Sequence, residues 1–121
     1  MLNLDTHILI HALKGDLTRE EERLLTADAE WSISAIVLWE LAKLVQLKRV
    51  DMDLSDPEVV GAVSQVLVWP ITLEISIAST QLDVASDPAD ELIAATSLVH
   101  GIPLVTRDAR LRKSKRIPLA R

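Results

Sequence analysis

Apolar residues of this chain fall in short continuous runs that alternate with longer segments of helical spacing. The opening run "MLNL" predicts a short buried strand, and "DTHILIHALKG" predicts a helix that ends at Gly15, a residue type common at helix C-caps. The next segment, "LTREEERLLTADA", also has helical spacing. Thr18 is its expected N-cap, and acids follow in the first turns, where the helix dipole favours negative charge.

The middle of the chain repeats this alternation. The run "WSIS" predicts a second strand, and "AIVLWELAKLVQLKR" predicts a strongly apolar helix with a basic end. A further helix is expected in "LSDPEVVGAVSQVL", where Pro57 suits the first turn. The run "VWPIT" then predicts a third strand.

The last part of the chain predicts two more helices and one or two strands. The helices are expected in "LEISIASTQLDVA" and in "DPADELIAATSLVHG", which has Asp87 as its N-cap. The run "IPLVT" predicts a strand, and "RIPLA" is a candidate for a final one. Short apolar strands that alternate with helices are typical of a parallel sheet covered on both faces. We therefore expect a single α/β domain over residues 1–121, a three-layer α/β/α sandwich around four or five parallel strands.

Composition narrows the class of protein. The 121 residues are 49% hydrophobic, which suffices for one core, and none is cysteine, so disulfides and thiolate chemistry are excluded. No run approaches the roughly 20 apolar residues that cross a bilayer, and the N-terminus has no secretory signal pattern. We expect a soluble, cytoplasmic protein with no membrane contact.

Charge is unevenly distributed along the chain. The net charge is −5, but residues 107–121 hold seven of the thirteen basic residues and only one acid. Such a stretch either attracts a polyanion or an acidic partner, or is an ordinary solvated tail. Trp31, Trp39 and Trp69 are the only aromatic residues among Phe, Tyr and Trp, and we expect them in the core rather than stacked on bases.

Four acids stand where a parallel sheet would bring them together. Asp5 follows the first strand and Asp108 follows the "IPLVT" strand, while Asp90 and Glu40 lie in the early turns of two helices. Ligands of parallel sheets bind beyond the carboxyl ends of the strands, so these side chains can converge there. Clustered carboxylates repel one another, and a hard divalent cation such as Mg²⁺ or Mn²⁺ relieves that repulsion.

Each acid also has a simpler interpretation. Asp5 would cap the helix after it, Asp90 would complete a capping pair with the acid three positions earlier, and Asp108 would be an ordinary loop acid. Glu40 would pair with Lys43 one turn along, although an acid on so apolar a helix is costly without a partner. The combination of four acids carries more weight than any one of them.

Other candidate residues point less clearly to chemistry. His7 and His11 share one helix face at a spacing that suits zinc, but no third ligand or HExxH motif accompanies them, so we expect surface or partner contacts. Thr106, at a strand end, is a candidate for orienting a ligand or substrate oxygen. The chain has no Walker A, GxGxxG or GxSxG motif.

The stretches "LDTHILI", "SISAIVLWELAKL" and "DPADELIAATSLVHGIPLVTRD" resemble, in this order, the PIN-domain proteins and more narrowly the VapC toxins of type II toxin–antitoxin pairs. The resemblance covers nearly the whole chain. It implies a Rossmann-like sandwich and an Mg²⁺- or Mn²⁺-dependent endoribonuclease. The family's metal-binding and catalytic acids would fall on Asp5, Glu40, Asp90 and Asp108, with Thr106 as an accessory group.

By this resemblance Asp5 would be the central metal ligand, and Glu40 would hold a water or a second ion. The basic residues near the last acid would contact the RNA backbone, namely Arg107, Arg110, Arg112, Lys113, Lys115 and Arg116. Expected partners are RNA, a small VapB-like antitoxin that crosses the acidic groove, and a second copy of the chain in a homodimer. Many relatives carry an aromatic residue and an arginine where this chain has Ala89 and Glu91, which bears on substrate preference or rate.

Two other functions remain open at this stage. An inactive α/β module that only binds another protein would not need the intact set of acids. A phosphohydrolase of the haloacid dehalogenase type also begins with a strand-end aspartate, but it needs a second aspartate two residues later, where this chain has His7.

Overall fold

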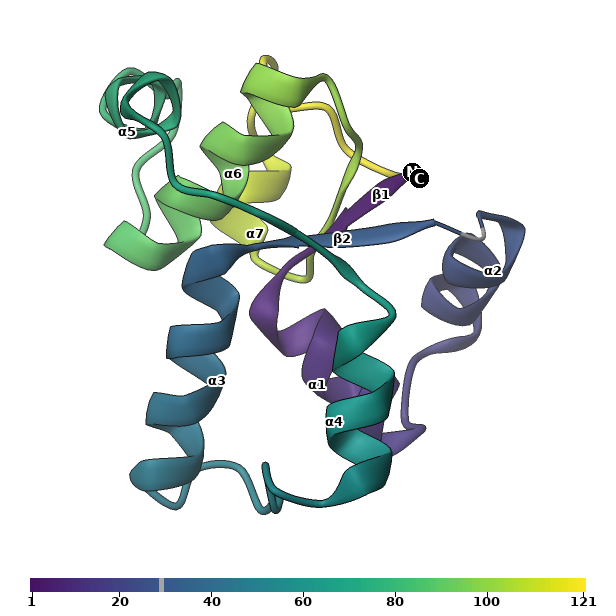
Figure 1. Ribbon diagram of the computed structural model, residues 1–121. Coiled ribbons are helices and arrows are strands. Elements are labelled where there is room, and N and C mark those ends of the chain that lie inside the picture. Colours follow the sequence, from purple (N-terminus) through teal and green to yellow (C-terminus); the bar gives the residue numbers. More distant parts are fainter. Residues whose placement is uncertain (29) are drawn as a thin grey trace.

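The computed structural model describes residues 1–28 and 30–121, which form a four-stranded sheet with helices on both sides (Figure 1). The strands are β1 (Leu2–Leu4), β2 (Trp31–Ser34), β3 (Leu67–Trp69) and β4 (Leu104–Val105). The helices are α1 (Thr6–Lys14), α2 (Arg19–Ala27), α3 (Ala35–Gln46), α4 (Pro57–Ser64), α5 (Leu73–Ser79), α6 (Pro88–His100) and α7 (Ala109–Arg112).

The sheet has the order β3-β2-β1-β4, and all three neighbouring pairs are parallel. The predicted parallel α/β architecture is therefore confirmed. Leu4 pairs with Val105, and the Asp5 amide donates to the Val105 carbonyl at 3.0 Å. Because β1 and β4 are adjacent and parallel, the residues that follow them, from Asp5 and from Thr106 onward, emerge at one edge of the sheet.

Side chains from both faces of the sheet build the core. On one face the fully buried Asn3 donates through Nδ2 to the Ile93 carbonyl at 3.1 Å and to Ser97 Oγ at 2.9 Å, which fixes α6 against β1. In Figure 1, α1 and α4 lie on the opposite side of the two central strands. Leu4 and Ile33 are fully buried, so the middle of the sheet is shielded from solvent.

The predicted helix ends are largely confirmed. Gly15 follows α1 with φ 73° and Gly101 follows α6 with φ 66°, both in the left-handed region that glycine adopts without strain. Thr18 caps α2 as predicted, within a reciprocal capping box. The second predicted helical segment extends to residue 29, which lies outside the described residues.

Three helices are shorter than predicted. Helix α3 ends at Gln46 because the chain turns at Lys48, which has φ 58°. Helix α4 ends at Ser64, so that Leu67 joins β3. Helix α5 ends at Ser79 because the following segment bonds to the C-terminal stretch instead, through contacts such as that from Ser114 Oγ to Asp83 at 2.5 Å.

Two further expectations need correction. The stretch over residues 116–120 forms only one bridge, between Leu104 and Leu119, because Pro118 has no N–H to extend a ladder. Trp39 is 57% exposed on α3, so it is not a core residue. Within the described residues, no helix has the length and apolar character needed to cross a membrane.

Candidate functional site

Asp5 occupies the junction between β1 and α1. It is the N-cap of α1, and its Oδ1 accepts from the Thr6 amide at 2.7 Å. Its Oδ2 accepts from Thr106 Oγ1 at 2.5 Å. The residue is only 3% exposed, and this burial raises the pKa of Asp5, although the bonds from Thr106 and Thr6 oppose the shift. The simpler reading of Asp5 as a cap is thus confirmed, and the same geometry fixes its carboxylate at the sheet edge.

Glu40 faces Asp5 from α3. Its Oε1 accepts from Thr6 Oγ1, so Thr6 contacts both acids, one through its amide and the other through its hydroxyl. The alternative pairing with Lys43 is not formed, because Lys43 donates to Gln46 Oε1 at 2.9 Å. Thr6 therefore couples the positions of two carboxylates that are distant in sequence.

Asp90 lies half-buried in the first turn of α6 and accepts from Ser86 Oγ at 3.1 Å. Burial raises the pKa of Asp90 to about 7, and the negative charge of Asp5 is the next largest cause. Asp87 occupies the N-cap position but accepts no capping bond, so the capping pair considered for Asp90 is not present. The pKa of Asp90 is therefore raised first by its burial and second by the carboxylates of Asp5, Glu40 and Asp108.

Asp108 is the N-cap of α7, and its Oδ1 accepts from the amides of Arg110 and Leu111 at 2.8 and 3.2 Å. Its own amide donates to Thr106 Oγ1 at 3.0 Å, while Thr106 donates to Asp5. The buried Thr106 hydroxyl thus links two of the four acids. This is an orienting arrangement of the kind predicted for Thr106.

All four acids line one cavity of about 440 Å³, together with His7, His11, Asp87, Arg107 and Arg110. Carboxylate oxygens are the ligands that Mg²⁺ and Mn²⁺ prefer, and a cation would stabilise the charged form of Asp90, which burial and the nearby Asp5 disfavour. In the described residues, no group of three or more His, Cys, Asp or Glu side chains is already arranged to hold one ion. The donor set fits a hard divalent cation, and closing on it requires side-chain movement.

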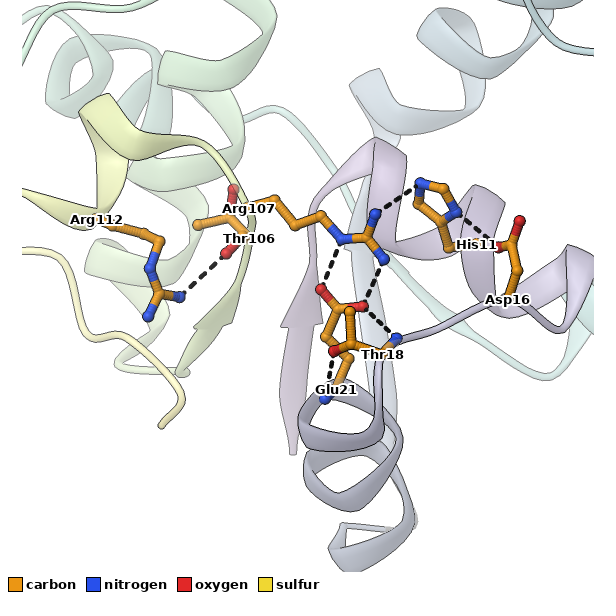
Figure 2. A network of polar contacts seen from close by, with 7 residues as sticks. All are labelled: His11, Asp16, Thr18, Glu21, Thr106, Arg107 and Arg112. Atoms are coloured by element: carbon orange, nitrogen blue, oxygen red, sulfur yellow. Dashed lines mark hydrogen bonds and ion pairs between the residues drawn. The ribbon is translucent and has the colours of Figure 1, made fainter.

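Arg107 belongs to a network that the sequence did not reveal (Figure 2). Its Nε and Nη2 donate to Glu21 Oε2 and Oε1, both at 2.6 Å, and its Nη1 lies 3.1 Å from His11 Nε2. His11 Nδ1 in turn contacts Asp16 Oδ1 at 2.6 Å. These bonds lower the pKa of Glu21 to about 2 and raise that of Arg107. Arg107 is therefore already engaged within the protein.

The other predicted RNA contacts lie at the surface around α7. Arg110 is exposed, with its Nη2 at 3.8 Å from both Asp87 Oδ2 and Asp108 Oδ2. Arg112 Nη1 donates to the Thr106 carbonyl at 3.2 Å, and Lys113 is exposed just after α7. Arg110 and Arg112 lie on α7, which Asp108 caps, and Lys113 follows it directly, so all three cations lie near the acidic cavity.

Comparison with known proteins places this fold in a family. The sequence profile of the PIN domain matches residues 3–117. Ribonuclease VapC22 of Mycobacterium tuberculosis is 36% identical over 92 residues, which are 71% of this chain and 68% of that protein.

Solved structures agree at the level of the fold. A toxin-antitoxin complex from Klebsiella pneumoniae matches with a TM-score of 0.75 and 22% identity, covering 99% of this chain and 97% of the other. VapBC2 from Rickettsia felis, bound to a promoter DNA fragment, matches with a TM-score of 0.75 and 18% identity, covering 99% and 98%. With a family match over nearly the whole length and a relative above 30% identity, the chain belongs to the PIN-domain family, as a protein of the VapC type.

Proposed function

We propose that the protein is a metal-dependent endoribonuclease, the toxin component of a toxin–antitoxin pair. Its relative from Mycobacterium tuberculosis is named a ribonuclease, and its structural neighbours include toxin-antitoxin complexes. The observation that carries the proposal is that Asp5, Glu40, Asp90 and Asp108 line one cavity although they come from four separate parts of the chain.

The four carboxylates would hold Mg²⁺ or Mn²⁺, with Asp5 as the central ligand. When bound, the ion would lower the pKa of the attacking water and neutralise charge that builds on the scissile phosphate. Asp5 suits a central position because Thr6 and Thr106 fix both of its oxygens. Asp90, whose pKa is raised to about 7, would lose its proton readily once a cation is near.

Arg110, Arg112 and Lys113 would contact the RNA backbone beside the cavity. All three are exposed, and an acidic site cannot attract RNA without neighbouring cations. Each phosphate contact adds to the salt dependence of binding, so RNA affinity should fall steeply as salt rises.

A small antitoxin would bind the toxin outside the acidic cavity as well as across it. Helices α1 and α4 enclose a second cavity of about 460 Å³, whose lining includes Leu9, Leu13 and Trp31 with Asp56 and Glu58. Its apolar lining and acidic side chains suit a partner segment that alternates apolar and basic residues.

A homodimer is proposed from the exposed apolar side chains. Leu73 is 77% exposed on α5, and Trp39 and Ile77 are also exposed on α3 and α5. Each of these large apolar side chains is a candidate contact with a second copy of the chain.

The test is cleavage of structured RNAs by the purified protein with Mg²⁺ or Mn²⁺. Cleavage should disappear in chelator and in Asp5→Asn, whereas Asp51→Asn, the same change at an exposed loop residue, should cleave like the parent. Cleavage that survives Asp5→Asn or chelation would refute the metal centre. An intact fold without cleavage of any RNA would favour the inactive binding module instead.

A further inference from the structure

Arg107 is one of the residues that line the acidic cavity, but its guanidinium is directed elsewhere. Asp5, Asp90 and Asp108 line the same cavity, whereas the guanidinium points toward Glu21 and His11 (Figure 2). Guanidinium groups pair strongly with carboxylates, and the bidentate form is among the strongest polar contacts in proteins. Yet within residues 1–28 and 30–121 the only ion pair of Arg107 is with Glu21 on α2. A separate feature of the fold must hold Arg107 away from the cavity acids.

Both partners of Arg107 are themselves held in place (Figure 2). Glu21 is the N3 residue of the α2 capping box, and its Oε1 also accepts from the Thr18 amide at 2.9 Å. His11 accepts from Arg107 at Nε2, so its ring proton is assigned to Nδ1, which then donates to Asp16. Arg107 is thus bound by the side chains of Glu21 and His11, whose positions are set by α1, α2 and the loop between them.

We propose that Glu21 and His11 are positioning residues that restrain Arg107 and so keep the acidic cavity open for a divalent cation. The inference rests on the cation site proposed above. Once released, the Arg107 guanidinium would pair with the nearest cavity carboxylates and take the place of the ion. A cation beside a carboxylate lowers its affinity for a proton about ten- to a thousandfold, and a divalent ion would meet the same competition.

A purely structural role makes different predictions. The same contacts tie the 106–108 segment to α1 and α2. If their role is purely structural, Arg107 only keeps Asp108 in position. Loss of either Arg107 or Glu21 would then weaken cation binding, and loss of both would be no better. Under the restraint that we propose, loss of Glu21 weakens cation binding whereas loss of Arg107 does not, because Arg107 competes with the ion only when Glu21 is absent.

The experiment measures Mn²⁺ affinity by electron paramagnetic resonance of free Mn²⁺ at neutral pH, with no RNA present. Glu21→Gln preserves the capping box, because Gln also serves at N3, but removes the charge that holds Arg107. We expect its Mn²⁺ dissociation constant to rise about tenfold or more. Arg107→Gln should bind Mn²⁺ at least as tightly as the parent, and the double variant Glu21→Gln/Arg107→Gln should return to the parent value.

The control is Glu22→Gln, the same charge change in the first turn of α2, at a residue other than the one that pairs with Arg107 in the described part of the chain. It should bind Mn²⁺ like the parent. Parent-like binding by Glu21→Gln, weakened binding by Arg107→Gln, or failure of the double variant to recover would each overturn the restraint. If Glu21→Gln does not fold, Arg107→Gln decides alone, because weakened Mn²⁺ binding overturns the restraint and unchanged or tighter binding supports it. A parent protein that binds no Mn²⁺ would refute the cation site itself. Tight parent binding with weakened binding in both single variants would refute only the restraint.

Discussion

Replacing Asp90 with asparagine should stabilise the protein in the absence of metal ions, and only above acidic pH. The folded-state pKa of Asp90 is about 7 against an ordinary value of 3.8, because the residue is desolvated and lies near Asp5. The folded state therefore binds the proton more tightly than the unfolded state. Ionisation of Asp90 does not lower the free energy of unfolding below pH 4. The loss grows as the pH rises from about 4 to 7 and reaches its full value above pH 7.

The size of the effect follows from that pKa difference. At 1.36 kcal/mol per pKa unit, the interval from 3.8 to about 7 corresponds to at most about 4 kcal/mol. Asp90 is only half-buried, so solvent screening reduces this, and we expect about 2 kcal/mol at pH 8. Asparagine keeps an oxygen that can accept the bond from Ser86. The stabilisation should appear as a rise in Tm of roughly 5–10 °C.

The assay is urea unfolding in chelator at pH 4, 6 and 8, for the parent and for Asp90→Asn. The free energy of unfolding of the variant should exceed that of the parent at pH 8 and match it near pH 4. Saturating Mn²⁺ at pH 8 should narrow the gap, because the ion stabilises the parent more than the variant. A difference that is independent of pH, or a variant less stable than the parent at pH 8, would refute the raised pKa of Asp90 that its burial and the nearby Asp5 produce.

Three further changes test other parts of the site and the core. Thr106→Val removes the hydroxyl that links Asp5 to the Asp108 amide, so the Mn²⁺ dissociation constant should rise about tenfold in calorimetric titration, and an unchanged value would deny Thr106 an orienting role. Arg107→Gln should cost about 1 kcal/mol at pH 7, a cost that shrinks as the pH falls from 4.5 and disappears only below about pH 2, because the pKa of Glu21 is lowered to about 2. A cost that stays constant in acid unfolding curves would contradict the ion pair. Ile33→Ala, at a fully buried position of β2, should cost about 2–5 kcal/mol in urea unfolding, and a loss below 1 kcal/mol would place Ile33 outside the core.

The fold could be predicted because its signals are local. Continuous apolar runs identified the strands, and residues with specific backbone or capping preferences marked where helices begin and end, such as Gly15 and Thr18. The predicted helix lengths were wrong where a contact with a distant part of the chain determines where the helix ends. Helix α5 stops at Ser79 because the next segment bonds to the C-terminal stretch, which its own residues do not encode. Trp39 was misplaced because hydrophobicity alone does not say which side of α3 is covered.

Only part of the candidate site could be predicted from the sequence in this way. The four acids could be proposed because strand ends of a parallel sheet share an edge, which is a rule of topology. The Glu21–Arg107 pair could not, because 86 positions separate the two residues and each has an adequate local reading, one in a capping box and the other in a basic tail. Such a pair depends on how α2 is placed against the 106–108 segment. The pattern of apolar and polar residues does not predict that placement.

Helix capping and cation binding are alternative interpretations of Asp5 and Asp108 in the sequence, but the two roles are compatible in the folded protein. Each residue lies shortly after a strand and caps the helix that follows. Backbone amides therefore hold one carboxylate oxygen and orient the other. In Asp5 the second oxygen accepts from Thr106, and in Asp108 it faces the exposed Arg110 at 3.8 Å. An acid anchored through one oxygen loses little further side-chain entropy when its second oxygen meets an ion. A capping aspartate at the end of a parallel strand is therefore a better candidate ligand than a free loop acid, because the cap supplies the orientation that a metal site needs.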